Sequence, residues 1–380
     1  MKKIVVASDS FKGSLTSLQV ADSVEKGVHD VCPSCAVVKV NVADGGEGTM
    51  DALMHTLGGS KVFVDVHDPL GRPMKAPYVI LEDGCTAVVE MSVASGLTLL
   101  ELQERNPLVT STYGTGEQIR DALSRGCRKF LVGIGGSATN DAGMGMLTAL
   151  GFRFLDTEGR ALEGCGAALE SVRGIDVSQV DEAVTDAQFI VACDVDSPFC
   201  GPKGAAYVFA PQKGADPAMV ERLDAGMASF ASVIKENIGK DIVDLPGAGA
   251  AGGLGGGFVA FLDARLERGI EMVLDAIDFD DMIHGADLVF TGEGRVDSQT
   301  LTGKTPYGVM KRAVKQGIPV VAIGGSVMLG ENDDVSSFAG IWPVTPSGMP
   351  LSEAMNPAVA SENIRRTVST IMKTITENHE

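Results

Sequence analysis

The sequence has few aromatic and few basic residues. Phe, Trp and Tyr together make up 5% of its 380 residues, and the chain has one tryptophan. Lys and Arg number 31 against 50 Asp and Glu, so the formal net charge is −19. This balance argues against non-specific binding to nucleic acid or to an anionic membrane, and Trp342 and the phenylalanines show no stacking platform. The 44% of hydrophobic residues excludes a disordered chain.

Long hydrophobic segments and paired cysteine motifs are also lacking. The apolar run Ile4–Ala7 ends at Asp9 and is too short for a secretory signal. The longest uncharged stretch, Leu245–Leu262, predicts a loop that enters a buried helix, and its Gly247–Gly257 run suits a tight helix approach or a hinge. The seven cysteines are scattered, and the Cys32–Cys35 pair precedes a strand, whereas a redox motif would follow one. We therefore expect free thiols and a cytoplasmic protein without a membrane partner.

Histidine is scarce, with five residues in the chain. They are His29, His55, His67, His284 and His379. None has the spacing of a metal site, none lies in a glycine-rich segment, and no Gly-x-Ser-x-Gly motif is present. Histidine-based catalytic triads are therefore poorly supported.

Strand and helix patterns alternate at the start of the chain. Residues 3–8 and 36–42 predict strands, and residues 16–29 and 49–57 predict amphipathic helices. This order predicts a parallel sheet with right-handed crossovers. Residues 61–91 instead contain three short strands separated by turn residues, which indicates a meander and a change of domain.

Later segments return to the α/β pattern. Further predicted elements are a long helix at 217–238, a strand at 287–291, a helix at 306–316, a strand at 319–323 and a final helix at 361–374. We expect two α/β domains. Residues 1–62 and 285–380 form a Rossmann-like domain with a parallel sheet, residues 63–284 form a second α/β domain inserted into it, and the active site lies in the cleft between them.

Glycine is abundant, at 47 residues, and most glycines follow predicted strands. In open α/β sheets, ligands bind beyond the carboxyl ends of strands, where glycine lets backbone N–H groups approach an anion. Five such segments stand out, at residues 9–14, 43–49, 133–141, 192–198 and 291–305.

The first two segments carry charged residues before predicted helices. Residues 9–14 place Ser10, Lys12 and Ser14 before a helix, which suits an anion, and an ordinary helix cap beside a solvated lysine is the alternative. Residues 43–49 place Asp44 and Glu47 among three glycines, which suits Mg²⁺ or sugar hydroxyls. The alternative is a helix that Asp44 caps.

The third segment offers many hydrogen-bond donors for phosphate oxygens. Its candidate substrate or phosphate ligands are Gly135, Gly136, Ser137, Thr139 and Asn140. The segment also matches the dinucleotide pattern Gly-x-Gly-x-x-Ala from Gly133 to Ala138, although Asp156 matches the expected acidic residue only in part.

The fourth segment places Asp194 at a strand end, as a candidate base or metal ligand. A turn built on Asp196-Ser197-Pro198 is the alternative.

The fifth segment ends in Gly303-Lys304-Thr305, which imitates a P-loop. Ser298 stands where a P-loop requires glycine, so the spacing fails. The segment nevertheless supplies components of phosphoryl transfer, namely cations for phosphates and a carboxylate for Mg²⁺ or for the nucleophile. Its candidate residues are Gly292, Gly294, Arg295, Asp297 and Lys304.

In these five segments the chain resembles the type I glycerate kinases of bacteria. The motifs are Asp9-Ser-Phe-Lys-Gly-Ser, Ala43-Asp-Gly-Gly-Glu-Gly-Thr, Gly135-Gly-Ser-Ala-Thr-Asn-Asp, Ala192-Cys-Asp-Val and Thr291-Gly-Glu-Gly-Arg-Val-Asp-Ser-Gln-Thr-Leu-Thr-Gly-Lys. They occur in the family's order over nearly the whole chain. Two departures are Asp141-Ala142-Gly143, where Asp-Gly-Gly is expected, and Asp196-Ser197-Pro198, where Asn-Pro is expected after Asp-Val.

The resemblance implies phosphorylation of D-glycerate with ATP and Mg²⁺, in glycerate, glyoxylate or sugar-acid catabolism. It favours 2-phosphoglycerate over 3-phosphoglycerate and leaves the oligomeric state open. Catalysis of phosphoryl transfer is mostly positioning and charge neutralisation. The expected roles are cations at Lys12, Arg295 and Lys304, a proton acceptor or orienting group at Asp194 or Asp297, and Mg²⁺ or hydroxyl ligands at Asp44 and Glu47.

Two other functions stay open from the residues themselves. An NAD-dependent hydroxy-acid oxidoreductase would use Gly133–Ala138 but would leave Gly292–Lys304 unexplained. A non-catalytic sensor of sugar acids would make the many catalytic-type acids superfluous.

Overall fold

The computed structural model describes residues 1–377. The chain forms two compact units: the terminal unit, Met1–Asp44 with Val273–Glu380, and the inserted unit, Gly45–Met272. Both are mixed α/β units that contain parallel strands, as the sequence predicted. The expected domains assign residues 45–62 and 273–284 differently from these compact units. That division, and the cleft expected between the domains, stay predictions.

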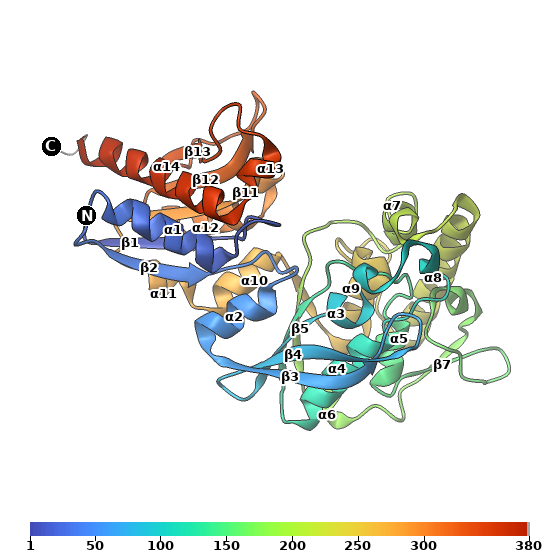
Figure 1. Cartoon of the computed structure of the whole chain (residues 1–380). Helices are drawn as coiled ribbons and strands as arrows, with labels where there is room; N and C mark the ends of the chain where they lie inside the picture. The colour runs from blue at the N-terminus through green and yellow to red at the C-terminus, as the bar shows by residue number, and fades with distance from the viewer. Residues whose placement is uncertain (378–380) are drawn as a thin grey trace. The chain divides into compact units, whose positions relative to one another are not determined.

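A parallel sheet of five strands forms the centre of the terminal unit (Figure 1). Its strands are β1 (Lys3–Ser8), β2 (Ala36–Asn41), β11 (Leu288–Asp297), β12 (Val320–Met328) and β13 (Gly340–Pro343). They lie in the order β13-β12-β11-β1-β2, and each neighbouring pair is parallel. The chain moves in one direction from β1 to β2 and in the other from β11 to β13. The strand order therefore reverses between β1 and β11, and such a switch point is where open α/β sheets bind ligands.

Helices α1 (Ser17–His29) and α14 (Pro357–Glu377) pack side by side, although they come from opposite ends of the chain (Figure 1). Alternate strand residues such as Ile4, Val6 and Phe290 share one buried core with them. The unit also contains α11 (Phe279–Ile283), α12 (Thr305–Lys315), α13 (Leu351–Ala354) and the 3-10 turn η5 (Thr300–Thr302), while α10 (Gly269–Ala276) crosses the unit boundary. Helix α12 contacts β1, β11 and β12.

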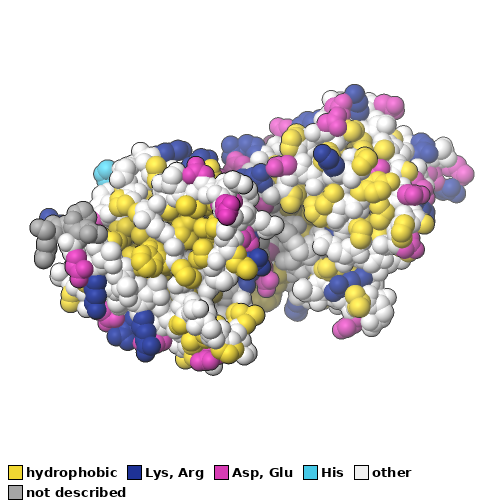
Figure 2. Space-filling model, turned by 90° about the horizontal axis from the view of Figure 1, so that it is seen from above, with side chains coloured by type: hydrophobic (Ala, Val, Ile, Leu, Met, Phe, Trp, Pro, Cys, Tyr) yellow, Lys and Arg dark blue, Asp and Glu magenta, His cyan; other side chains and the backbone are white. Residues whose placement is uncertain are grey.

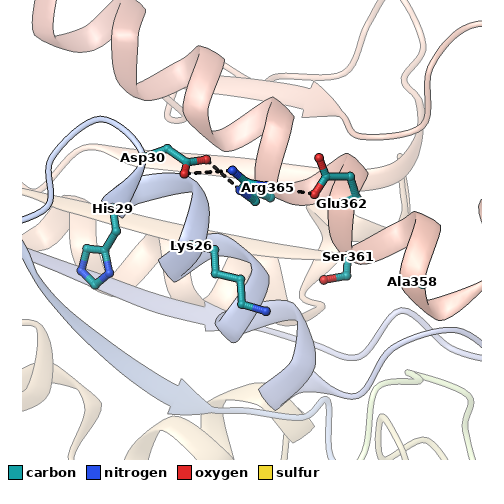
Figure 3. A pocket seen from close by; sticks show the side chains of 7 residues that line it. All are labelled: Lys26, His29, Asp30, Ala358, Ser361, Glu362 and Arg365. Atoms are coloured by element: carbon teal, nitrogen blue, oxygen red, sulfur yellow. Dashed lines mark hydrogen bonds and ion pairs between the residues drawn. The ribbon is translucent and has the colours of Figure 1, made fainter.

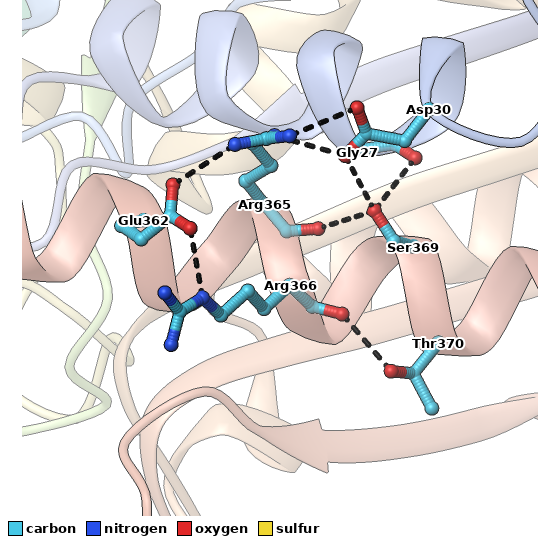
Figure 4. Close-up of polar contacts among 7 residues, drawn as sticks. All are labelled: Gly27, Asp30, Glu362, Arg365, Arg366, Ser369 and Thr370. Atoms are coloured by element: carbon cyan, nitrogen blue, oxygen red, sulfur yellow. Dashed lines mark hydrogen bonds and ion pairs between the residues drawn. The ribbon is translucent and has the colours of Figure 1, made fainter.

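Gly27 allows α1 and α14 to approach each other closely (Figure 4). A Cβ atom at Gly27 would lie 2.6 Å from the carbonyl oxygen of Arg365 and 2.8 Å from the Cβ atom of Val368. Beside this contact, the Arg365 guanidinium donates to both carboxylate oxygens of Asp30, at 2.9 and 3.1 Å, and Ser369 Oγ donates to Asp30 Oδ2 at 2.9 Å. The glycine therefore sets the distance at which these polar side chains meet.

We expect Gly27→Ala to lower the free energy of unfolding by about 1–3 kcal/mol, because the added methyl group forces two packed helices apart. Urea unfolding followed by circular dichroism measures this change. Lys26→Ala, at an exposed position of the same helix, is the matched control and should change the stability by less than about 0.5 kcal/mol. Equal stability of Gly27→Ala and the wild type would contradict this account of the helix contact.

The inserted unit contains a mixed sheet of six strands in the order β10-β9-β6-β5-β4-β3. They are β3 (Gly59–His67), β4 (Pro73–Leu81), β5 (Thr86–Glu90), β6 (Lys129–Gly133), β9 (Gln188–Ala192) and β10 (Arg265–Glu267), and a separate hairpin pairs β7 (Arg153–Leu155) with β8 (Gly174–Asp176). Strands β3, β4 and β5 form the antiparallel meander that the sequence predicted. Strands β5, β6, β9 and β10 run parallel. Their carboxyl ends therefore meet at one edge, where Glu90, Gly133 and Ala192 are in register.

Helices and short turns connect these strands. They are α2 (Thr49–Leu57), α3 (Ser92–Ser95), η1 (Leu97–Leu99), η2 (Leu102–Glu104), α4 (Tyr113–Ser124), α5 (Met144–Ala149), η3 (Gly166–Ser171), α6 (Glu182–Thr185), α7 (Ala205–Phe209), η4 (Pro211–Lys213), α8 (Pro217–Ile238) and α9 (Ala250–Leu262). The rings of Phe154, Phe230 and Phe261 pack together in the core of this unit, with centroids 5.5–6.3 Å apart. Within residues 1–377, no helix is both long and apolar enough to cross a membrane.

The glycine-rich start of α9 packs directly against the backbone that follows β6. A Cβ atom at Gly252 would lie 2.1 Å from the carbonyl oxygen of Thr139, and one at Gly257 would lie 2.5 Å from that of Ala142. The carbonyl oxygen of Gly252 also accepts a hydrogen bond from the backbone N–H of Ala142 at 3.0 Å. The Gly247–Gly257 run therefore provides a tight approach of the helix to this backbone, which is one of the two roles expected for it.

Candidate active site

A pocket of about 610 Å³ lies in the terminal unit, at the carboxyl ends of β1, β11 and β12. It brings together eight of the residues that the sequence singled out: Ser10, Lys12, Ser14, Asp44, Gly294, Arg295, Asp297 and Lys304. Asp9 and Glu293 line it as well. Both belong to the glycine-rich motifs but were not among the sequence candidates. Their positions could have identified them, because Asp9 directly follows the buried strand β1 and Glu293 lies within the strand β11.

The first part of the segment at residues 291–305, up to Asp297, is a strand. β11 continues to Asp297 because β12 pairs with it beyond the end of β1. Successive side chains of a strand alternate between its two faces. Glu293, Arg295 and Asp297 therefore share one face, and all three line the pocket.

Gly292 and the P-loop-like sequence have structural roles of their own. Gly292 is not among the residues that line the pocket, and a Cβ atom there would lie 2.3 Å from the carbonyl oxygen of Ile323. Its lack of a side chain is therefore needed for pairing with β12, and its phosphate role stays a prediction. Lys304 directly precedes α12 and lines the pocket, and Thr305 Oγ1 is buried without a hydrogen-bond partner in the described part of the chain.

Three carboxylates of the pocket influence one another. Burial, followed by the charge of Asp44, raises the pKa of Asp9 to about 7. Burial also raises the pKa of Glu293, whose carboxylate accepts a hydrogen bond from Thr300 Oγ1. Lys12 Nζ lies 3.6 Å from Asp44 Oδ2. The three carboxylates Asp9, Asp44 and Glu293 therefore favour a bound cation.

Asp297 is held in place at the end of β11. Its Oδ1 accepts a hydrogen bond from the backbone N–H of Gln299 at 3.0 Å, and its own backbone N–H donates to Thr300 Oγ1 at 2.9 Å. Arg295 Nε lies 3.3 Å from Asp297 Oδ2. A cation and a candidate base thus stand side by side in the pocket.

The segment after β6 is more buried than a phosphate-binding loop should be. Gly135 and Gly136 are exposed, whereas Ser137, Thr139 and Asn140 are buried. Within residues 1–377, Thr139 Oγ1 and Asn140 Oδ1 have no hydrogen-bond partner. Direct contact of these side chains with a ligand stays a prediction.

The dinucleotide pattern in this segment lacks its structural context. That fingerprint requires the glycine-rich turn to open a helix. Here no helix begins between Gly133 and Ala138, and α5 starts only at Met144. The interpretation as a dinucleotide-binding loop is therefore not supported.

The buried side chain of Lys213 binds the segment after β6. The sequence analysis did not identify this lysine. Its side chain is 1% exposed, and its Nζ donates to Ser137 Oγ and to the carbonyl oxygen of Thr139, both at 2.6 Å. Burial lowers the pKa of Lys213 to about 7, although the charge of Asp141 acts in the opposite direction. Asp141 is itself buried, and its Oδ2 accepts hydrogen bonds from the backbone N–H and the hydroxyl of Thr112 at 2.8 and 2.7 Å.

Two carboxylates lie at the carboxyl edge of the inserted sheet. Glu90 ends β5 and accepts a hydrogen bond from the backbone N–H of Met50 at 2.8 Å, and burial raises its pKa to about 7. Asp194 follows β9, is exposed, and accepts a hydrogen bond from the backbone N–H of Gly269 at 2.9 Å. The sequence singled out Asp194 but not Glu90, which lies in an otherwise apolar strand.

The predicted metal ligands Asp44 and Glu47 belong to different units. Asp44 lines the pocket of the terminal unit, and Glu47 is exposed in the inserted unit. The alternative in which Asp44 caps α2 is wrong, because Gly48 precedes that helix and no side chain caps it. In the described residues, no group of three or more His, Cys, Asp or Glu side chains is arranged to hold a metal ion.

A second pocket, of about 650 Å³, lies between α1 and α14 (Figure 3). Its lining residues are Lys26, His29, Asp30, Ala358, Ser361, Glu362 and Arg365. Arg365 is already paired with Asp30 and, at 3.3 Å, with Glu362. Because none of the glycine-rich motifs lines this pocket, the candidate site is the pocket at β1, β11 and β12.

The known proteins that are similar to this chain include glycerate kinases. A family model described as the glycerate kinase family matches residues 4–376. Glycerate kinase of Bacillus subtilis strain 168 is 45% identical, over 98% of this chain and 97% of its own. Glycerate 2-kinase of Escherichia coli K12 is 43% identical, over 98% of this chain and 99% of its own. A crystal structure of a proposed glycerate kinase 2 from Salmonella typhimurium LT2 is 42% identical and superimposes with a TM-score of 0.90, covering 100% of this chain and 99% of that one. The chain therefore belongs to the glycerate kinase family.

Proposed function

We propose that this chain transfers the γ-phosphoryl group of ATP to the 2-hydroxyl of D-glycerate, giving ADP and 2-phosphoglycerate. Kinase activity follows from the family, and the 2-position is supported by the name of the Escherichia coli relative, a glycerate 2-kinase. The observation that carries the proposal is the pocket of the terminal unit, where Lys12, Arg295 and Lys304 meet. Four carboxylates, Asp9, Asp44, Glu293 and Asp297, line the same pocket. Three cations beside four carboxylates at the switch point of a sheet suit an anionic ligand that binds together with a divalent cation.

In this proposal the cations neutralise phosphate charge and a carboxylate handles the proton. Lys12, Arg295 and Lys304 contact phosphate oxygens, which is the main catalytic contribution in phosphoryl transfer. The glycerate hydroxyl oxygen forms a bond to the γ-phosphorus as the bond from that phosphorus to the ADP oxygen breaks. The hydroxyl proton passes to Asp297 or Asp194. Asp297 is supported by its place beside Arg295 in the same pocket.

The carboxylates of the pocket fit a divalent cation. Burial and, second, the charge of Asp44 raise the pKa of Asp9, and a bound cation would stabilise its charged form. Mg²⁺ commonly takes one or two carboxylates and completes its shell with substrate phosphates and water, so the lack of a three-residue protein site does not conflict with it. We assign Asp44 to Mg²⁺, and Glu47, which belongs to the inserted unit, stays a predicted ligand. When bound, the ion supplies charge neutralisation of the ATP phosphates.

A cytoplasmic location is part of this proposal. The seven cysteines form no disulfide within residues 1–377. Free thiols are typical of a reducing compartment.

A coupled assay of ADP release tests the proposed reaction. With ATP and Mg²⁺ present, we expect ADP release that depends on added D-glycerate, and phosphorus NMR should identify the product as 2-phosphoglycerate. A reaction without the acid is the control. No ADP above that control would refute the proposal, and binding of the acid without turnover would indicate a sensor. A signal of the 3-phosphate would correct the position of transfer alone.

A further inference from the structure

Part of the wall of the terminal-unit pocket is apolar, and none of the roles proposed for the charged residues uses it. We define the apolar wall as Met328, Val344, Met349, Leu351 and Met355, all of which line the pocket. Leu351 is 76% exposed, Met328 59% and Met355 36%. Large apolar side chains that gather at the surface mark binding sites more often than chance exposure does. Figure 2 shows hydrophobic side chains gathered on the terminal unit's face turned toward the viewer.

Glycerate gives this wall nothing to bind. It has three carbons, a carboxylate and two hydroxyls, so nearly all of its surface is polar. Phosphate groups are charged and gain nothing from methionine and leucine side chains. Of the two proposed substrates, only the adenine ring of ATP has broad apolar faces.

We propose that the apolar wall binds the adenine ring of ATP and that the triphosphate extends from it toward Lys12, Arg295 and Lys304. This assignment rests on the proposed function and locates its nucleotide site within the terminal unit. The pocket volume of about 610 Å³ lies in the range of about 300–1,000 Å³ that is usual for small-molecule sites. Such sites combine an apolar lining with a few placed polar groups, which is the composition found here.

The apolar wall is continuous with the phosphate end of the pocket. Met355 Cε lies 2.9 Å from the position that a Cβ atom of Gly13 would occupy, so the wall touches the loop that carries Lys12. In the same loop, Ser14 lines the pocket, and its Oγ is buried without a hydrogen-bond partner among the described residues. The loop therefore offers a polar atom and a cation next to the apolar surface.

The apolar end also has a polar group suited to a purine edge. Asn363 of α14 is buried and lines the pocket, and its Nδ2 lies 3.5 Å from Met349 Sδ. A side-chain amide offers both donors and an acceptor. An adenine edge likewise presents a donor beside an acceptor, so Asn363 is placed to orient the ring.

Titration calorimetry on the full chain tests this site without glycerate. With Mg²⁺ present, ATP should bind the wild type at least tenfold more tightly than inorganic tripolyphosphate. ATP differs from tripolyphosphate by its adenosine group, so the ratio of the two dissociation constants measures the contribution of that group. In the double variant Leu351→Ser/Met355→Ser this preference should fall below about threefold, while the dissociation constant of tripolyphosphate stays within about twofold. Leu102→Ser, at an exposed leucine of the inserted unit, is the matched control and should keep the full preference.

The outcomes separate this site from the kinase proposal. A wild type without preference for ATP, a double variant that keeps the preference, or one that loses tripolyphosphate binding equally would each overturn the assignment. If thermal unfolding shows that the double variant is damaged, Met328→Ser on β12 provides the same test from another element. Because no acid is present, an intact preference for ATP combined with a failed ADP-release assay would count against the proposed function alone.

Discussion

Either Asp297→Asn or Asp194→Asn, whichever removes the base, is expected to lower kcat by a factor on the order of 10²–10⁴, the range for loss of a positioned general base. The amide cannot take the hydroxyl proton, but it has nearly the same shape as the carboxylate. It also keeps an oxygen that accepts the existing hydrogen bonds, from Gln299 to position 297 and from Gly269 to position 194. The coupled ADP-release assay measures kcat and KM for both substrates.

The loss of activity is informative only if both variants keep the fold of the wild type. Asp297→Asn loses a partly exposed ion pair with Arg295, and surface pairs of this kind contribute about 0–1 kcal/mol. Asp196→Asn is the matched control, because Asp196 is an exposed carboxylate near Asp194 that is paired with Arg268. It should change kcat by less than about threefold. Activity close to wild type in both Asp297→Asn and Asp194→Asn would refute the assignment of the base to either residue.

The ends of several helices could be predicted because the signals that set them are local. Helix α8 covers Pro217–Ile238 as the sequence indicated. Asp216 caps its start through a 2.8 Å hydrogen bond from the backbone N–H of Met219, and Gly239 ends it with a left-handed φ of 80°. Helix α2 also agrees with its predicted range. Neither the caps nor the terminating glycines depend on distant parts of the chain.

Strand length depends on partners, and here the sequence was a poorer guide. Glycines and charges after Thr291 indicated a loop, yet β11 continues to Asp297 because β12 supplies a pairing partner for it. The same pairing gives the charged residues of β11 a common face. Carboxyl ends of parallel strands meet at one edge of a sheet, and Lys12, Asp44 and Lys304, from the first, second and fifth segments, do line one pocket.

Burial by distant segments could not be predicted from the motifs alone. The polar residues of the segment after β6 suggested an open loop, but Lys213 and the glycines of α9 cover its backbone and Ser137. Lys213 itself lies between Pro211-Gln212 and Gly214, a local pattern typical of an exposed turn. Only the folded inserted unit shows that this lysine is enclosed.

Lys213 makes the stability of the inserted unit depend on pH. Burial lowers its pKa from 10.5 to about 7 in the folded chain. Between these values the unfolded chain holds a proton that the folded chain has released, so the free energy of unfolding rises as the pH rises. Below pH 7 both states carry the proton and this contribution no longer changes. One proton corresponds to about 1.4 kcal/mol per pH unit.

Relative to Lys213→Met, the wild type should therefore gain about 2–3 kcal/mol of stability between pH 7 and pH 9. Urea unfolding of both proteins at matched pH values measures this difference, and contributions of other titrating groups, such as Glu90, cancel in the comparison. Lys203→Met, at an exposed lysine of the same unit, should follow the wild type over the whole range. Methionine keeps the length of the lysine stem but removes the charge and the donors to Ser137 and Thr139, so its stability curve should be displaced as well as flattened. Parallel curves for the wild type and Lys213→Met would show that this lysine keeps its proton in the folded chain and would overturn the account of its burial.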